Sequence, residues 1–133
     1  MISLIDTNVI LRFLTADKSN KYQNLYSFFK SIERGEINVE LKLIVLFQVI
    51  FVLKSFYQIP KEKIVDGLLK LLRYKGIRIK EKKIVLRTLD LLKTTNLEIV
   101  DCYLISCMEG DKQNILYSYD NDFDKFNINR IEP

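Results

Sequence analysis

Aspartates stand at places along the sequence where folding could bring them together. Asp6 follows the apolar run 1–5. Asp120 follows the run 115–119, and Asp122 comes two residues later. Each run has the pattern of a strand, and parallel α/β sheets collect ligands at the carboxyl ends of their strands. A single aspartate at a strand end is more often a cap or turn residue than a ligand, so only the combination indicates a site.

The chain of 133 residues contains no histidine, and this excludes several kinds of catalytic site. A Ser-His-Asp triad, a Cys-His pair and a histidine-rich zinc site all need an imidazole. Clustered carboxylates repel one another and need a cation or raised pKa values to coexist. Mg²⁺ or Mn²⁺ is the natural cation for a site made only of oxygen ligands.

Two further polar residues stand in apolar helical patterns. Asp101 has two leucines and an isoleucine among its neighbours one helical turn away. It either caps its helix or points into a metal pocket. Gln48 is the only polar residue between Lys42 and Lys54. Its amide either bonds to backbone in the core or projects into the same polar pocket as the aspartates.

The expected elements alternate between strands and helices. Apolar periodicity predicts helices over 7–14, 21–32, 43–57, 61–74, 81–93 and 98–108, and a helical turn over 122–126. It predicts strands over 1–5, 37–39, 77–79, 115–119 and 128–131. The fold class that follows is a three-layer α/β/α sandwich with a mostly parallel central sheet, in one domain of residues 1–133.

Several of these elements carry finer expectations. The run 1–5 should be a buried strand, 77–79 an exposed edge strand, and 43–57 a central helix that is apolar nearly all round. Asp6 or Thr7 should cap the first helix. Pro60 stands where a helix should begin, and glycines should end three helices, at Gly35, Gly76 and Gly110.

Charge and cysteine content restrict the surroundings of the protein. Residues 54–93 hold 12 Lys and Arg against 4 Asp and Glu, whereas the rest of the chain holds 9 against 13. The basic segment either solvates amphipathic helices or contacts an acidic partner. Cys102 and Cys107 should lie on different faces of a helix and stay unpaired, which fits a reducing, cytoplasmic compartment. The most apolar stretch, 43–53, is too short to span a bilayer, so no membrane association is expected.

Four segments, in order along the chain, carry a family resemblance. The opening ISLIDTNVILRFLTAD resembles the start of PIN-domain ribonucleases, especially VapC-type toxins of bacterial and archaeal toxin–antitoxin pairs. LIVLFQVIFVLKSFYQIPKEKI is similar to the second motif region of that family, and IVDCYLISCM to the third. LYSYDNDFDKF is similar to the fourth, which usually has Thr or Ser, then Asp, then Asp-Phe.

This resemblance implies a metal-dependent endoribonuclease that hydrolyses RNA phosphodiesters with Mg²⁺ or Mn²⁺. The catalytic and metal-binding residues carried over by position are Asp6, Asp101 and Asp120, with Asp122 as a further metal ligand. Asn8 and Ser118 match positions that support the pocket by hydrogen bonds. The resemblance also implies a cognate antitoxin protein and a homodimer.

One position departs from the family pattern. The second motif normally presents a glutamate where this chain has Gln48. Glutamine keeps a carbonyl oxygen as a ligand but removes one negative charge, which should weaken metal binding and activity. The alternative function is therefore a catalytically degenerate PIN-like module that binds RNA or an antitoxin. A phospho-acceptor domain is disfavoured, because no acceptor aspartate on a central strand is followed by a lysine after a late strand.

The basic segment would supply phosphate contacts if RNA is the substrate. The candidates for such contacts are Lys61, Lys63, Lys70, Arg73, Lys75, Arg78, Lys80, Lys82, Lys83 and Arg87.

Overall fold

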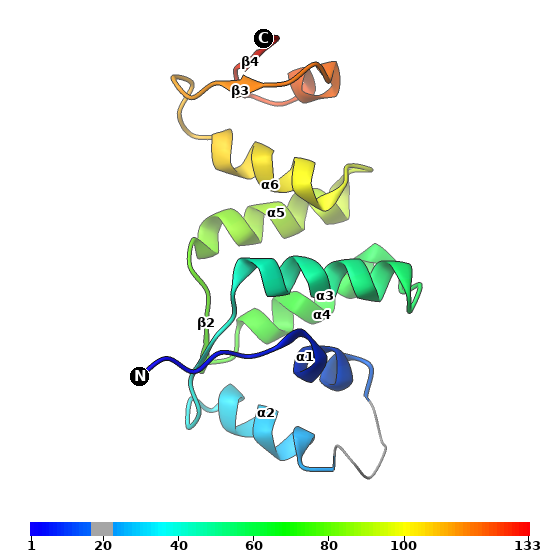
Figure 1. Ribbon diagram of the computed structural model, residues 1–133, viewed down its shortest axis with the longest axis vertical. Helices are drawn as coiled ribbons and strands as arrows, with labels where there is room; N and C mark the ends of the chain where they lie inside the picture. The colour runs from blue at the N-terminus through cyan, green and yellow to red at the C-terminus, as the bar shows by residue number, and fades with distance from the viewer. Residues whose placement is uncertain (17–22) are drawn as a thin grey trace. The chain divides into compact units, whose positions relative to one another are not determined.

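The computed structural model describes residues 1–16 and 23–133, which form two compact units (Figure 1). Unit 1 is Met1–Lys80 and unit 2 is Glu81–Pro133. Each unit combines helices with very short strands, and all strand pairs among the described residues are parallel. Parallel pairing with intervening helices is the α/β pattern that the sequence predicts.

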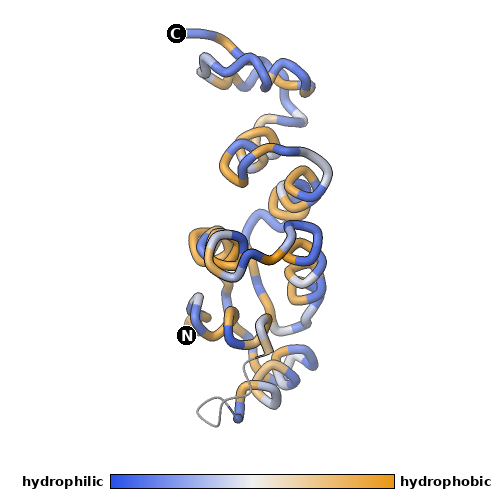
Figure 2. The backbone as a smooth tube through the Cα atoms, turned by 90° about the vertical axis from the view of Figure 1, so that its right-hand side faces the viewer, coloured by the Kyte–Doolittle hydropathy of each residue, from blue (hydrophilic) through white to orange (hydrophobic). Residues whose placement is uncertain are grey.

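Unit 1 combines four helices among its described residues with a small parallel sheet. Its elements are α1 (Thr7–Leu14), α2 (Leu25–Glu33), β1 (Val39–Glu40), α3 (Leu43–Ser55), α4 (Lys61–Leu72) and β2 (Ile77–Arg78). Val39 pairs with Ile77, and Leu4 forms an isolated bridge to Glu40 on the other side of β1. Ile5 and Leu41 follow the paired residues Leu4 and Glu40 and point to the opposite side of the sheet from them. Both are buried in the core together with apolar residues of the helices. The hydrophobic residues of the helices recur at each turn, as the orange segments in Figure 2 show.

Unit 2 consists of two packed helices followed by a small α/β element. Helix α5 (Lys82–Thr94) packs against α6 (Ile99–Met108) and buries Leu89, Cys102 and Ile105 between them. The chain continues through β3 (Leu116–Tyr117), the 3₁₀ helix η2 (Asn121–Lys125) and β4 (Arg130–Ile131). Strands β3 and β4 pair in parallel, and they lie side by side in Figure 1.

The helices lie where periodicity predicts them, with shorter ends. The second helix begins at Leu25, after a turn at residues 23–24, and the first two residues predicted for it lie outside the described ranges. The predicted helices 43–57 and 61–74 both end two residues early. The remaining strands are also shorter than predicted, because parallel pairing reaches only two residues in each.

Gly76 does not end a helix, and that prediction is wrong. Helix α4 ends at Leu72, and Gly76 lies where the chain passes close to other backbone. Its N–H donates to the carbonyl oxygen of Ile32 at 2.8 Å. A Cβ at this position would clash with the carbonyl oxygen of Ile37, so glycine is required for close approach.

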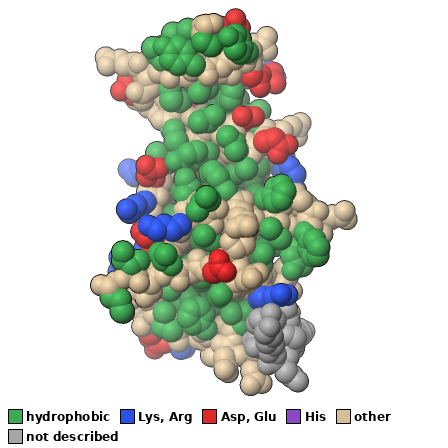
Figure 3. Space-filling view, viewed as in Figure 1, with side chains coloured by type: hydrophobic (Ala, Val, Ile, Leu, Met, Phe, Trp, Pro, Cys, Tyr) green, Lys and Arg blue, Asp and Glu red, His purple; other side chains and the backbone are tan. Residues whose placement is uncertain are grey.

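Two burial predictions are also wrong. In the run 1–5, Met1, Ile2 and Leu4 are exposed, and Ile5 alone joins the core, because this segment is the outer strand of the small sheet in unit 1. Helix α3 is not buried all round, because its contacts with α1 and α4 cover one side while Ile44 and Phe51 are exposed. Hydrophobic side chains are visible over much of the face shown in Figure 3.

The predictions for the edge strand and for the cysteines are confirmed. Strand β2 is an edge strand of the sheet in unit 1, with Arg78 exposed. Both cysteines are free thiols, Cys102 buried and Cys107 partly so. No helix among the described residues is long and apolar enough to cross a membrane. The three-layer sandwich and the single domain stay predictions.

Candidate functional site

Asp6 stands at the start of α1, and its carboxylate is not used to cap that helix. The residue holds the N-cap position with extended backbone, φ −91° and ψ 159°. Asp6 is therefore the N-cap residue, as one of the two predicted alternatives has it, but within the described part of the chain its side chain accepts no capping hydrogen bond. Asn8, two residues on, is exposed on the first turn of α1. The exposed carboxylate of Asp6 is therefore left for other chemistry.

Gln48 reaches the beginning of α1 from the middle of α3. Its Oε1 accepts a hydrogen bond from Oγ1 of Thr7 at 3.1 Å. Thr7 is buried, at 8% exposure, whereas Gln48 is exposed. The amide is therefore not a core group bonded to backbone, and it ends beside the residue that follows Asp6. Sequence reasoning missed Thr7 as a partner of Gln48, because the two residues are 41 positions apart.

Asp101 lies in the first turn of α6 and is not its N-cap. The N-cap is Glu98, and Asp101 is the third helical residue, so the capping alternative is wrong. The pKa of Asp101 is raised, first by burial of the carboxyl group and then by the negative charges of Asp120, Glu98 and Asp122. Asp120 and Asp122 are thus close enough to Asp101 to act on its charge. Unit 2 brings these three predicted site residues within electrostatic reach of one another.

The acidic loop, residues 118–124, follows β3 and has a defined conformation. Oδ1 of Asp120 accepts the backbone N–H of Asp122 at 2.9 Å and so caps η2. Oγ of Ser118 accepts the backbone N–H of Asp120 at 3.0 Å. Asp122 has an ion pair with Lys125 at 3.6 Å. Ser118 therefore contacts the backbone that presents Asp120.

Arg130 of β4 ties the acidic loop to the strands, and sequence reasoning did not identify it. Its Nε and Nη2 donate to the two carboxylate oxygens of Asp124, at 2.8 and 2.9 Å. Its Nη1 donates to the carbonyl oxygen of Ser118 at 2.9 Å and to Glu132 at 3.1 Å. An arginine within the predicted strand 128–131 was the available signal, since such a side chain needs carboxylate partners when it is largely buried.

The predicted metal ligands belong to both units, Asp6 to unit 1 and the other three aspartates to unit 2. Within each unit, no three acidic or cysteine side chains among the described residues lie close enough together to hold a metal ion. The donor chemistry nevertheless fits a hard divalent cation, because the ligands offered are carboxylate oxygens. The raised pKa of Asp101 also records a repulsion that a bound cation would relieve.

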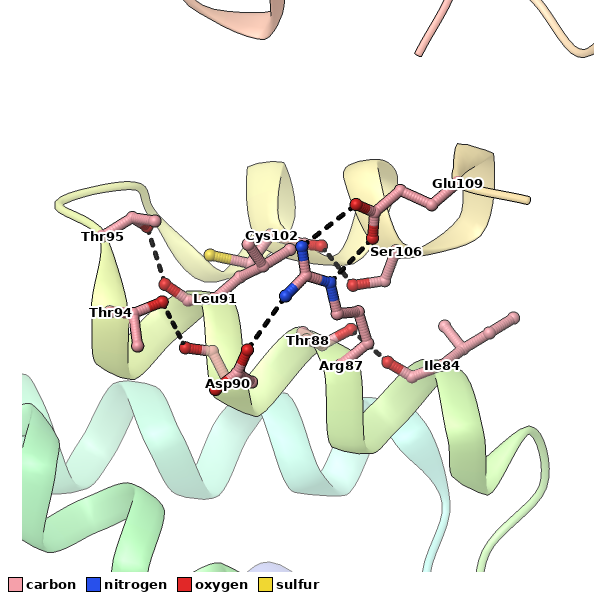
Figure 4. Close-up of polar contacts among 10 residues, drawn as sticks. All are labelled: Ile84, Arg87, Thr88, Asp90, Leu91, Thr94, Thr95, Cys102, Ser106 and Glu109. Atoms are coloured by element: carbon pink, nitrogen blue, oxygen red, sulfur yellow. Dashed lines mark hydrogen bonds and ion pairs between the residues drawn. The ribbon is translucent and has the colours of Figure 1, made fainter. Parts of the chain in front are cut away.

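Most of the candidate phosphate-binding residues are exposed, and one is already engaged. Exposed members of unit 1 are Lys63, Lys70, Arg73, Lys75, Arg78 and Lys80, and those of unit 2 are Lys82 and Lys83. Arg87 of α5 instead reaches Glu109 at the end of α6, with Nε and Nη2 donating at 2.8 and 3.0 Å (Figure 4). Its Nη1 donates to Asp90 at 2.9 Å. Arg87 is therefore a poor candidate for a phosphate contact.

The structure is that of an α/β protein without histidine, with one carboxylate at a helix start in unit 1 and others after a parallel strand in unit 2. The model of the PIN domain family matches residues 3–129, so the chain belongs to the PIN domain family. PIN domains are generally nucleases, a class of hydrolase, and they usually use divalent metal ions. No curated protein matches this chain.

Proposed function

We propose that this protein is a metal-dependent endoribonuclease that hydrolyses phosphodiester bonds in RNA. The observation that carries the proposal is the raised pKa of Asp101, which is caused first by burial of its carboxyl group and then by the negative charges of Asp120, Glu98 and Asp122. Carboxylates that repel one another are costly to keep together, so their proximity favours a site that binds cations. Family membership supports nuclease chemistry for that site.

The proposed ligands of Mg²⁺ or Mn²⁺ are Asp6, Asp101, Asp120 and Asp122. A bound divalent cation supplies charge for the scissile phosphate and lowers the pKa of a coordinated water. The chain itself contributes the carboxylates and the contacts that aim them. Ser118 bonds to the backbone of Asp120, and we propose that Asn8 supports the same site from the first turn of α1.

Gln48 is proposed as a neutral member of the same site. Its carbonyl oxygen already accepts a hydrogen bond from Thr7, which aims the amide towards the start of α1. A glutamate at this position would add one negative charge and strengthen cation binding. The proposed enzyme is therefore weaker than one that carries a glutamate there.

The proposed biological role is that of a toxin in a toxin–antitoxin pair. The proposed protein forms a homodimer and binds a cognate antitoxin protein. The four-motif resemblance supports this role. The exposed lysines and arginines of residues 61–83 are the proposed contacts for RNA phosphates. Two free thiols support a reducing, cytoplasmic compartment for the proposed enzyme.

The test compares two aspartates that make the same local contact in unit 2. Oδ1 of Asp120 accepts the N–H of Asp122, and Oδ1 of Asp111 accepts the N–H of Gln113, both at 2.9 Å. Asparagine keeps an oxygen for either bond, so Asp120→Asn and Asp111→Asn both preserve the turn. We expect RNA cleavage with Mn²⁺ to disappear in Asp120→Asn and to persist in Asp111→Asn. Equal cleavage by both variants, or full activity in a chelator, would refute the proposal.

The second candidate function is an RNA- or antitoxin-binding module without turnover. Gln48 favours it, because the site lacks the charge of an expected glutamate. The Gln48→Glu variant separates the two functions. Hydrolysis that appears only in this variant identifies the chain as a degenerate nuclease, whereas comparable hydrolysis by both proteins identifies it as an enzyme.

A further inference from the structure

We propose that Arg130 is the positioning residue of the acidic loop, and that it sets how Asp120 and Asp122 are presented to a cation. This inference deepens the proposed nuclease function and rests on it. Arg130 does not contact the proposed ligands themselves, and it acts through Ser118 and Asp124, which stand before and after them in the chain.

The contacts of Arg130 close the acidic loop from both sides. Nη1 bonds to the carbonyl oxygen of Ser118, where the chain leaves β3. Nε and Nη2 grip both oxygens of Asp124, inside η2. The five residues between these two anchors include Asp120 and Asp122. The planar guanidinium of Arg130 therefore holds Ser118 and Asp124 at a fixed separation, and the loop between them carries both carboxylates.

The chemistry of this contact needs an arginine. A guanidinium presents its donors in a planar fork, which matches a carboxylate in two places and still leaves Nη1 for a carbonyl oxygen. A lysine ammonium is a single point of positive charge and would have to choose between Asp124 and Ser118. The Arg130 side chain is 12% exposed, against 55% for Asp124, so the guanidinium is held largely away from water.

The positive charge of Arg130 is directed to residues outside the proposed ligand set. Its ion-pair partners are Asp124 and Glu132, at 2.8 and 3.1 Å. Among the described contacts, neither Asp120 nor Asp122 is a partner of Arg130, and Asp122 pairs instead with Lys125 at 3.6 Å. The guanidinium orders the loop without occupying the place of the cation.

Arg87 offers a matched control in the same unit. It makes the same two-pronged contact with a carboxylate, that of Glu109, and a third bond to Asp90. That cluster links α5 to the end of α6 and has no residue of the acidic loop in it (Figure 4). Replacing either arginine by lysine keeps the charge and removes the fork.

The experiment measures Mn²⁺ binding by electron paramagnetic resonance in the full chain, for wild type, Arg130→Lys and Arg87→Lys, with thermal melting of each. We expect Arg130→Lys to weaken Mn²⁺ binding by about tenfold or more, as outer contacts of metal ligands commonly do, and Arg87→Lys to leave it unchanged. Asp124→Asn removes the carboxylate charge that Arg130 binds and so weakens the same contact. It should also weaken Mn²⁺ binding, and it keeps the test available if Arg130→Lys does not fold.

Each outcome bears on one or both proposals. Unchanged binding in Arg130→Lys, or equal weakening in Arg87→Lys, overturns the positioning role. Binding that depends on Arg130 in a protein that does not cleave RNA refutes the nuclease function and leaves the positioning role intact. If wild type cleaves RNA and Arg130→Lys binds Mn²⁺ as wild type does, the nuclease function stands and the positioning role is refuted. A wild-type protein that binds no Mn²⁺ overturns both.

Discussion

The two units carry unlike sets of candidate site residues. In unit 1, Asp6 is followed by Thr7, whose hydroxyl donates to the neutral amide oxygen of Gln48. In unit 2, the pKa of Asp101 is raised, first by burial of its carboxyl group and then by the negative charges of Asp120, Glu98 and Asp122. Negative charge is concentrated in unit 2, where it is held against repulsion. We therefore expect the carboxylates of unit 2 to contribute most of the attraction for a cation, and Gln48 and Thr7 of unit 1 to contribute mainly orientation.

The largest expected effect tests where that charge is needed. Asp101→Asn should lower kcat/KM for RNA cleavage by at least about a hundredfold, because it removes a preorganised charge from the site. Gln48→Ala, which removes only the neutral amide, should cost far less. The measurement is steady-state cleavage of a labelled RNA at fixed Mn²⁺. A larger loss in Gln48→Ala than in Asp101→Asn would contradict the assignment of the main cation attraction to unit 2.

The second prediction adds a negative charge to unit 1, whose candidate site residues carry less of it than those of unit 2. Gln48→Glu should tighten Mn²⁺ binding by about tenfold, because each added carboxylate raises the attraction for a hard cation. Isothermal titration with Mn²⁺ measures the change. The control is Gln58→Glu, which adds the same charge at an exposed position in the turn after α3. Equal tightening in the control would mean that net charge, and not the site, is responsible.

The orientation assigned to unit 1 depends on Thr7. Thr7→Val keeps the shape of the side chain and removes the hydroxyl that bonds to Gln48, at a cost of about 1 kcal/mol in unfolding free energy. The matched control is Thr88→Val in α5, a buried threonine whose hydroxyl bonds to the carbonyl oxygen of Ile84 in its own helix. Chemical denaturation measures both.

We expect the two valine variants to lose similar stability and to differ in function. RNA cleavage should fall in Thr7→Val and remain at the wild-type level in Thr88→Val. A fall of equal size in both would assign Thr7 to the core alone.

The smallest expected effect concerns the stability of the metal-free protein. A carboxyl whose folded-state pKa is raised destabilises the fold once ionised, and this penalty grows as pH rises from the unfolded-state pKa through the folded one. Asp101→Asn should therefore be more stable than wild type at pH 7 by about 0.5 kcal/mol, since solvent screens the partly exposed carboxyl. The difference should vanish near pH 3, where Asp101 is protonated.

Denaturant unfolding in a chelator, at both pH values, measures this difference. Asp111→Asn is the control, because it removes a carboxylate from an exposed loop. A variant Asp101→Asn that is less stable than wild type at pH 7 would mean that Asp101 makes a stabilising contact.

Sequence patterns predict local structure well and long-range partners poorly in this chain. Helical periodicity places each of the six α-helices found in residues 1–16 and 23–133, because each buries apolar side chains at helical spacing. The bond from Thr7 to Gln48 joins segments 41 residues apart, and no local pattern reports it. The capping role considered for Asp101 fails because the helix begins at Ile99, with Glu98 as its N-cap, and apolar periodicity does not fix that boundary.

The candidate site shows the same division. The aspartates are visible in the sequence because they end apolar runs or interrupt them. Arg130 is not, because its importance comes from the fold of the chain between Ser118 and Asp124 rather than from its neighbours. Family membership is readable because it depends on several motifs in order, and residues 3–129 match as a whole.

Gly76 has a consequence for the genetics of this protein. In a library of all single substitutions, selected for function, position 76 should be as intolerant as Asp120, although glycine contributes no chemistry. The two kinds of loss differ in abundance, because a Cβ at position 76 collides with backbone and depletes folded protein. Substitutions of Asp120 should instead accumulate as folded, inactive protein, so a map of protein levels distinguishes a structural position from a catalytic one.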